Sequence, residues 1–245
     1  MPSVVITGAA GGIGTATCNV FLDAGYKVIG VDRRKTTGRA YEMIPFDISG
    51  LGRKDESCLK FFEHIKELVN GRLDVLINNA AIQIFKPIDQ INNEDWIETL
   101  NTNLLAPFWL IQELLPLLRR AKGNVVNIAS IHAKVTKSKF TLYTTSKGAL
   151  MSLTRTLALE LAPDVRVNTV VPAATDTPML RASFENDPEG FKALGEYHPM
   201  QRIARPEEVG HVALFLASPQ ASFITGSAYS IDGGIGACLP DPAKK

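Results

Sequence analysis

The 245-residue sequence has few cysteines: only Cys18, Cys58 and Cys238, which lie far apart along the chain. No CxxC pair and no cysteine–histidine cluster has metal-site spacing, so we expect neither a bound metal nor a structural disulfide. A low, odd count is typical of a reducing compartment, and the expected location is the cytoplasm. The first residues also lack the charged segment, apolar run and cleavage site of a secretory signal.

The sequence also lacks a long hydrophobic run and an excess of charge. No window approaches the roughly 18 apolar residues that a membrane span requires. The 26 Lys and Arg residues balance 25 Asp and Glu residues, which leaves a formal net charge of +1. Such a balance argues against nucleic acid or an anionic membrane as a partner, so a small molecule is the expected one. The hydrophobic content of 45% is that of an ordinary globular domain.

Short apolar segments rich in β-branched residues alternate with segments of helical periodicity. The first kind predicts strands and the second predicts helices. This alternation predicts a doubly wound, Rossmann-type parallel sheet with helices on both faces and a ligand crevice at the carboxyl ends of the strands. The predicted strands are 3–7, 27–32, 41–46, 74–77, 124–129, 165–171 and 228–231. The predicted helices are 13–24, 59–69, 95–118 (one helix or two), 146–161 and 207–216.

No linker rich in Pro, Gly or Ser divides the chain, so residues 1–245 are expected to form a single domain. Residues 173–205 stand apart, because they show neither a strand pattern nor an obvious core helix. A segment of that length inside a compact domain is usually functional, and we predict a lid over the substrate. The alternative is a surface excursion that packs on a neighbouring subunit.

A glycine-rich turn joins the first predicted strand to the first predicted helix. Gly8, Gly12 and Gly14 let the backbone turn tightly and approach a pyrophosphate without a Cβ in the way. The free N–H groups and the dipole of the helix then face the anion. The spacing G-x3-G-x-G differs from the general dinucleotide fingerprint, and a simple tight turn is the alternative. The position at the first strand–helix junction favours a dinucleotide.

Asp32 ends the second predicted strand, about 20 residues after the glycine-rich turn. An acidic side chain there can accept hydrogen bonds from both hydroxyls of the adenosine ribose and repels a 2′-phosphate, which favours NAD over NADP. The alternative is a solvated turn aspartate. Arg33 and Arg34 follow and are able to hold a 2′-phosphate, so NADP(H) stays open. Asp47 and Ile48, after the third predicted strand, are expected to bracket the adenine.

Tyr143 and Lys147 lie four residues apart, so on a helix they share one face. Tyrosine, with a pKa near 10, is a poor acid or base at neutral pH, but a nearby ammonium favours the phenolate and lowers that pKa. The pair therefore suits proton transfer to or from an alcohol, although YxxxK alone is a frequent surface accident. Ser130 closes the predicted strand 124–129, which places its hydroxyl at the carboxyl edge of the sheet.

In their order and spacing, these motifs resemble those of the short-chain dehydrogenase/reductase family almost from end to end. The segment TGAAGGIG at 7–14 resembles the family's TGxxxGxG, and NNAA at 78–81 resembles its NNAG, with Ala81 in place of glycine. Ser130, Tyr143 and Lys147 match its serine and YxxxK. The remaining matches are Asn103 to the family's catalytic asparagine, Val167-Asn168 with Pro172 to RVNxxxPG (Ala173 replacing glycine), and Asp232-Gly233-Gly234 to DGG.

The resemblance implies an NAD(P)-dependent oxidoreductase that interconverts a secondary alcohol and a ketone by hydride transfer. Tyr143 would be the general acid/base, Lys147 would lower its pKa and bind the nicotinamide ribose, and Ser130 would orient the substrate oxygen. Asn103 would hold a water molecule on a proton path from Lys147 to solvent. A dinucleotide-binding regulator without turnover is a third reading, marked by loss of one of these residues, and all are present.

The resemblance also implies further cofactor contacts. Asn79 and the backbone near Ile13 would touch the dinucleotide, and Thr177 would reach the carboxamide. Ala81 and Ala173 each add a methyl group beside the cofactor, which we expect the site to tolerate because the adjoining motif residues are intact.

The sequence does not identify the substrate or the assembly. Gln83, just past the fourth predicted strand, is expected to line the pocket. His132, with Lys134, Lys137 and Lys139, belongs either to a solvated loop or to a site that meets an anionic substrate. The predicted helices at 103–118 and 146–161 are apolar over more than one face, which predicts a homo-oligomer, a dimer or tetramer. A better-covered monomer core is the alternative.

Overall fold

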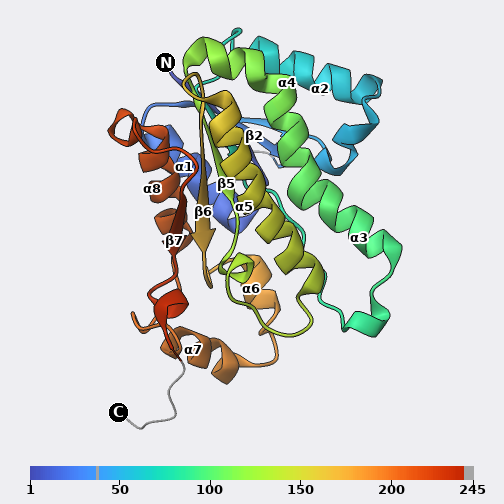
Figure 1. Cartoon of the computed structure of the whole chain (residues 1–245), viewed down its shortest axis with the longest axis vertical. Helices are drawn as coiled ribbons and strands as arrows, with labels where there is room; N and C mark the ends of the chain where they lie inside the picture. Colours follow the sequence, from blue (N-terminus) through green and yellow to red (C-terminus); the bar gives the residue numbers. More distant parts are fainter. Residues whose placement is uncertain (37–38, 240–245) are drawn as a thin grey trace.

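A computed structural model of the chain describes residues 1–36 and 39–239. Within these residues, a parallel sheet of seven strands runs in the order β3-β2-β1-β4-β5-β6-β7 (Figure 1). The order reverses between β1 and β4, which is where a doubly wound sheet opens its ligand crevice. The strands are β1 (Ser3–Thr7), β2 (Lys27–Asp32), β3 (Glu42–Pro45), β4 (Val75–Asn78), β5 (Asn124–Ile128), β6 (Arg166–Pro172) and β7 (Ala228–Ile231).

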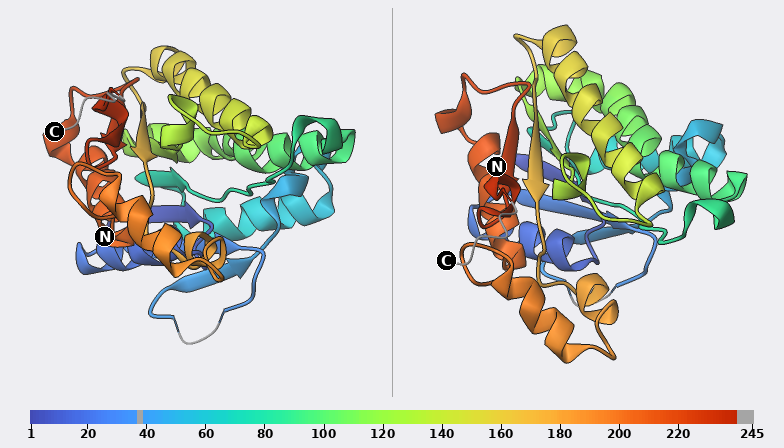
Figure 2. Two further views of the ribbon diagram at one scale, coloured as in Figure 1. Left: turned by 90° about the horizontal axis from the view of Figure 1, so that it is seen from below. Right: turned by 60° about the horizontal axis from the view of Figure 1, so that its bottom comes forward.

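Helices cover both faces of this sheet, as the continuous apolar strands predict (Figure 2). One core lies between the sheet and α2, α4 and α5, and the other lies between the sheet and α1 and α8. The helices are α1 (Gly12–Asp23), α2 (Glu56–Leu68), α3 (Asn93–Leu100), α4 (Ala106–Ala121), α5 (Thr141–Leu161), α6 (Pro178–Ala182), α7 (Pro188–Glu196) and α8 (Pro206–Ala217). Short 3-10 turns are η1 (Ile48–Arg53), η2 (Ile88–Gln90), η4 (Ile131–Ala133), η5 (Pro219–Ala221) and η6 (Ile235–Ala237).

Two predicted helical regions are defined further by the structure in ways that affect the site. The region 95–118, predicted as one helix or two, contains two, α3 and α4, which are separated by a π-helical segment, Asn101–Leu105. The predicted helix 146–161 begins earlier, at Thr141, so Tyr143 already lies in the first turn of α5. The fold class and the order of the strands along the chain are those predicted from the sequence.

The predicted irregular stretch 173–205 contains two short helices, α6 and α7, beyond the carboxyl end of β6 (Figure 1). Both begin with a proline after a capping side chain. Thr177 Oγ1 accepts from Leu180 N at 3.2 Å, and Asp187 Oδ1 accepts from Gly190 N at 2.8 Å. Helices this short have little room for a hydrophobic period, which is why the pattern alone misses them.

The apolar helices provide evidence both for a monomer and for a homo-oligomer. On α4, Leu110 and Leu114 are fully buried within one chain, so the core of the monomer already covers them. On the outer side, Leu159 of α5 and Ile97 of α3 remain exposed. The homo-oligomer therefore stays a prediction. No helix among the described residues is long and apolar enough to cross a bilayer.

Candidate active site

A cavity of about 790 Å³ lies at the carboxyl ends of the central strands. It draws its lining from the turn before α1, the ends of β2, β4, β5 and β6, the start of α5, and the region of α6 and α7. Of the residues predicted to form the site, Asn103 alone does not line this cavity. Those that do are Gly8, Gly12, Ile13, Gly14, Asp32, Asp47, Ile48, Asn79, Gln83, Ser130, His132, Tyr143, Lys147 and Thr177.

The glycine-rich turn is packed too closely to hold side chains at two of its positions. A Cβ on Gly14 would lie 2.0 Å from the carbonyl oxygen of Gly8. Gly8 itself has a φ of +66°, and a Cβ there would come within 2.8 Å of Ala80 Cα. No side chain caps the start of α1, so its first N–H groups remain available to an anion. The turn thus has the form of a phosphate cradle.

Asn79 braces this turn from the end of β4. Its side-chain Nδ2 donates to the carbonyl oxygen of Thr7 at 2.9 Å. In return, Thr7 Oγ1 accepts from the backbone N–H groups of Asn79 and Ala80 at 3.0 and 3.1 Å. The asparagine therefore lines the cavity and also holds the glycine-rich turn against the end of β4.

Asp32 is a charged carboxylate on the cavity wall with only 8% of its surface exposed. Its Oδ2 accepts from Ala10 N at 3.0 Å, and its Oδ1 accepts from the N–H and the Nε of Arg34 at 3.0 and 3.2 Å. Burial alone would raise the pKa of Asp32, but these hydrogen bonds lower it below the usual value. Further along, Asp47 Oδ1 caps η1 by accepting from Ser49 N at 3.0 Å, and Ile48 is buried beside it.

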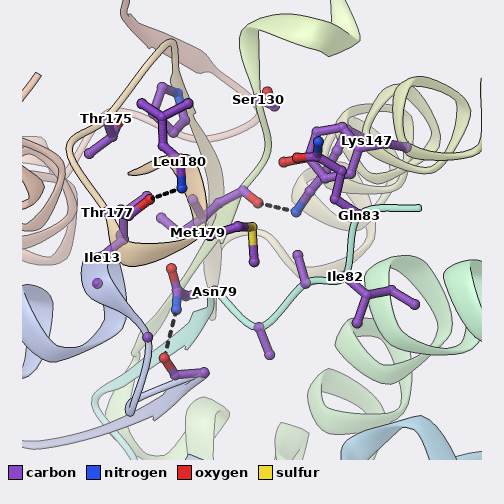
Figure 3. Close-up of a pocket in the computed structure, with 18 of the residues that line it drawn as sticks. Ile13, Asn79, Ile82, Gln83, Ser130, Lys147, Thr175, Thr177, Met179 and Leu180 are labelled. Atoms are coloured by element: carbon purple, nitrogen blue, oxygen red, sulfur yellow. Dashed lines mark hydrogen bonds between the residues drawn. The ribbon is translucent and has the colours of Figure 1, made fainter. Parts of the chain in front are cut away.

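Ser130, Tyr143 and Lys147 meet where β5 ends. Ser130 lies two residues beyond the end of the strand, and its Oγ accepts from His132 N at 3.2 Å. The Nζ of Lys147 donates to the carbonyl oxygen of Ile128 at 2.7 Å and lies 5.8 Å from the centre of the Tyr143 ring. Figure 3 shows Lys147 and Ser130 on the same side of the cavity, across from Asn79 and Ile13.

Burial governs the proton affinities of this cluster. It lowers the pKa of the Lys147 ammonium to about 7. It also raises the pKa of Tyr143 above its ordinary value, while the hydroxyl of Ser130 acts in the opposite direction. The sequence predicts a lowered tyrosine pKa. In the structure the largest influence on the pKa of Tyr143 is desolvation of the phenolate, which acts in the opposite direction.

Asn103 lies behind the cavity wall, in the π-helical segment, and is fully buried. Its Oδ1 accepts from Ile82 N at 2.9 Å, and its Nδ2 donates to Ile82 O at 2.9 Å and to Ser146 Oγ at 3.0 Å. Both amide hydrogens are therefore committed. The side chain ties the loop after β4 to α5, one residue before Lys147, and the predicted role in holding a water molecule stays a prediction.

Further lining residues come from the segment 173–205 that the sequence predicts as a lid, without being singled out by the sequence. Thr175, Met179 and Leu180 enter from the segment around α6 (Figure 3). His198, which follows α7, also lines the cavity, although it is only 3% exposed and its Nδ1 lies 2.8 Å from Leu194 O. These positions depend on how α6 and α7 fold back over the sheet, which periodicity does not encode.

Known proteins are similar to this chain in both sequence and fold. The family model described as enoyl-(acyl carrier protein) reductase matches residues 8–236. A 3-oxoacyl-[acyl-carrier-protein] reductase of Thermotoga maritima is 36% identical over 242 residues, covering 94% of this chain and 96% of the relative. The ligand-free aldohexose dehydrogenase of Thermoplasma acidophilum has a TM-score of 0.93 at 33% identity, covering 100% of this chain and 97% of that one.

A further solved structure carries a cofactor. The 3-ketoacyl-(acyl-carrier-protein) reductase of Brucella melitensis, in complex with NADH, has a TM-score of 0.84 at 29% identity and covers 96% of this chain and 98% of that one. These relatives cover nearly the whole chain, and the glycine-rich turn and the Ser130, Tyr143 and Lys147 cluster lie in one cavity. The chain therefore belongs to the short-chain dehydrogenase/reductase family of oxidoreductases.

Proposed function

We propose that this protein is an NAD(H)-dependent oxidoreductase that interconverts a secondary alcohol and a ketone, with Tyr143 as the general acid/base. One observation carries the proposal: Ser130, Tyr143 and Lys147 share a cavity with the glycine-rich turn and the charged Asp32. The close packing of Gly8 and Gly14 and the uncapped start of α1 fit a dinucleotide, since they leave backbone N–H groups free for its phosphates. When bound, NAD(H) supplies the hydride acceptor or donor.

The residues of the chain would hold the cofactor along the cavity. Gly12, Ile13 and Gly14 would face the pyrophosphate, and Asp32 the adenosine ribose. Asn79 and Thr177 lie on the path toward Lys147, which would bind the nicotinamide ribose. Asp47 and Ile48 would border the adenine. We assign residues 173–205 as the substrate lid, because Met179 and Leu180 line the cavity from this segment.

Proton transfer is the task of the side chains. In alcohol oxidation the Tyr143 phenolate accepts the hydroxyl proton as the hydride leaves the carbon, and in ketone reduction the phenol returns that proton to the oxygen. Ser130 donates a hydrogen bond to the same substrate oxygen and fixes its orientation. The Lys147 ammonium stabilises the phenolate, an effect strengthened by the low dielectric of the buried site.

A panel of secondary alcohols and ketones, followed by NADH absorbance, tests the proposed reaction. We expect oxidation of some alcohols with NAD⁺ and reduction of the matching ketones with NADH. An absence of turnover across the panel, with NADH still bound, would instead support a dinucleotide-binding regulator.

Asp32 is predicted to select NAD(H) over NADP(H). Its carboxylate is charged and holds Arg34, so a 2′-phosphate would meet the carboxylate and compete for that arginine. We expect the wild type to favour NAD⁺ in kcat/KM and Asp32→Ser to reduce this preference by about 10- to 100-fold. Asp23→Ser, at the exposed end of α1, is the matched control and should leave the preference unchanged. A strong NADP⁺ preference in the wild type would refute this assignment.

A further inference from the structure

The charged side chains that line the cavity are of both signs at the end of β2, where Arg33 and Arg34 follow Asp32, and they differ along the rest of its length. The acids are Asp32 at the end of β2, Asp47 before η1 and Glu98 on α3. Asp32 and Asp47 belong to the end assigned to the adenosine, whereas Glu98 lies on α3, which packs against α5. Among the described residues, the loop after β5 and the start of α5, which carry Ser130 and Tyr143, contribute Lys137 and Lys147 to the lining and no acid. The charged side chains of this part of the cavity wall are therefore all basic.

The three lysines between Ser130 and Tyr143 occupy different places. Lys134 lies outside the cavity, and its Nζ donates to Ser230 Oγ of β7 at 2.9 Å. The Nζ of Lys139 lies 5.6 Å from the centre of the Phe85 ring, also outside the lining. Only Lys137 of the three lines the cavity. In the part of the chain that the structure describes, none of them forms an ion pair.

An aromatic ring holds Lys137 beside the catalytic residues. Its Nζ lies 4.8 Å from the centre of the Phe140 ring, a cation–π distance. Phe140 is only 5% exposed, and its ring lies edge-on to that of Tyr143, with the centres 6.1 Å apart. The buried Phe140 ring therefore holds the Lys137 ammonium close to Tyr143, with only this ring between them.

His132 does not compete with Lys137 as the cation of this wall. It stacks on Phe140 at 4.4 Å, and burial together with the charge of Lys137 lowers its pKa to about 4. It is therefore neutral near pH 7. His132 thus contributes no charge, and Lys137 forms no ion pair with any described residue. Lys137 is therefore the cation near Tyr143 that an incoming anion would meet.

We propose that the substrate carries an anionic group, a carboxylate or a phosphate, and that Lys137 binds this group while Ser130 and Tyr143 engage the reacting oxygen. The inference rests on the proposed function, because it names the substrate class of the same site. An anion at this part of the wall meets the Lys137 ammonium and no acid from the same segments, so the charge pattern attracts it and orients it. A neutral substrate would use neither feature.

The test compares substrates that differ in charge and little in shape. Hydroxycarboxylates of graded length are paired with their primary amides, and hydroxyalkyl phosphates are paired with the corresponding diols. For the anionic member we expect Lys137→Ala to raise KM by about 10- to 100-fold with little change in kcat, as befits a charge-assisted contact remote from the reacting carbon. KM for the neutral member should change by less than about threefold. If the difference in KM appears with the hydroxycarboxylate pair, the anionic group of the substrate is a carboxylate. If it appears with the phosphate pair, the group is a phosphate.

Two further variants make the test specific. Lys137→Arg keeps the charge and should restore most of the affinity for the anion. Lys134→Ala removes an equal charge outside the cavity and should change neither KM. An equal rise in KM for both members of a pair, or an equal effect of Lys134→Ala, would overturn the proposal. A wild-type preference for the neutral members would do the same.

Binding measurements separate this inference from the proposed function. The same compounds are titrated into the NADH complex, with NADH fluorescence as the signal, which requires no turnover. Anion binding that depends on Lys137, without turnover of any compound, would support the anion site and overturn the proposed reaction. Turnover confined to neutral secondary alcohols, with no binding of the anions, would support the proposed reaction and overturn the anion site.

Discussion

A Tyr143→Phe variant is expected to bind NADH as the wild type does and to lose about 100- to 10,000-fold in kcat, the range that general acid–base catalysis contributes. The substitution removes the hydroxyl that accepts or donates the proton and leaves the ring. That ring packs edge-on to Phe140 and lies 5.8 Å from Lys147 Nζ, so its neighbours stay supported. The loss should therefore fall on the chemical step rather than on folding or cofactor binding.

Two measurements check this expectation. Titration of NADH fluorescence gives the Kd of the cofactor, which should change by less than about threefold, and steady-state kinetics gives kcat. Tyr26→Phe is the matched control, since Tyr26 packs against Phe21 outside the cavity and should keep full activity. Retained turnover in Tyr143→Phe would mean that another group transfers the proton.

Much of this site is predictable because its signals are local in the sequence. The glycine-rich turn follows an apolar strand directly, and Asp32 ends the next strand, so the topology alone brings them to one edge. Ser130 is placed in the same way by the end of β5. Tyr143 and Lys147 need only the helical period to share a face. In each case a short segment fixes the position of the side chain, and the parallel sheet gathers the segments.

What the sequence could not supply depends on burial and on contacts between distant segments. The lowered pKa of Lys147 and the raised pKa of Tyr143 arise from desolvation, which a spacing of four residues does not report. The position of Asn103 behind the wall depends on a π-helical segment that meets the loop at Ile82. Similarly, three lysines in one loop look equivalent in the sequence, and only the packing of Phe140 distinguishes Lys137 from the others.

Lys147→Met is expected to lower kcat for alcohol oxidation by about 10-fold or more near pH 7, where Lys147 still carries charge, and to move the rise in activity to higher pH. Oxidation requires the Tyr143 phenolate, and burial already raises the pKa of that phenol. Removal of the neighbouring ammonium removes the charge that favours the phenolate, so a smaller fraction is ionised at a given pH. The pH profile of kcat measures this shift. An unchanged profile would show that Lys147 does not act on Tyr143.

The same substitution is expected to stabilise the fold of the cofactor-free protein at low pH. Because burial lowers the pKa of Lys147 to about 7, far below that of an unfolded lysine, the unfolded chain binds more protons between about pH 7 and pH 10. The free energy of unfolding of the wild type therefore rises with pH across this window. Below pH 7 Lys147 is charged in the folded protein, and its burial lowers the free energy of unfolding by the full amount. Lys147→Met removes that dependence.

Thermal unfolding of both proteins at several pH values gives the measurement. The Tm of Lys147→Met relative to the wild type should be higher at pH 6 than at pH 9 by about 3 to 6 °C. The lost hydrogen bond to Ile128 O lowers the Tm of the variant at both pH values, so it cancels in this difference. Lys134→Met, on an exposed lysine, is the control and should show no such dependence. A difference that is the same at both pH values would mean that Lys147 is fully charged in the folded protein, and that Tyr143 faces a permanent ammonium.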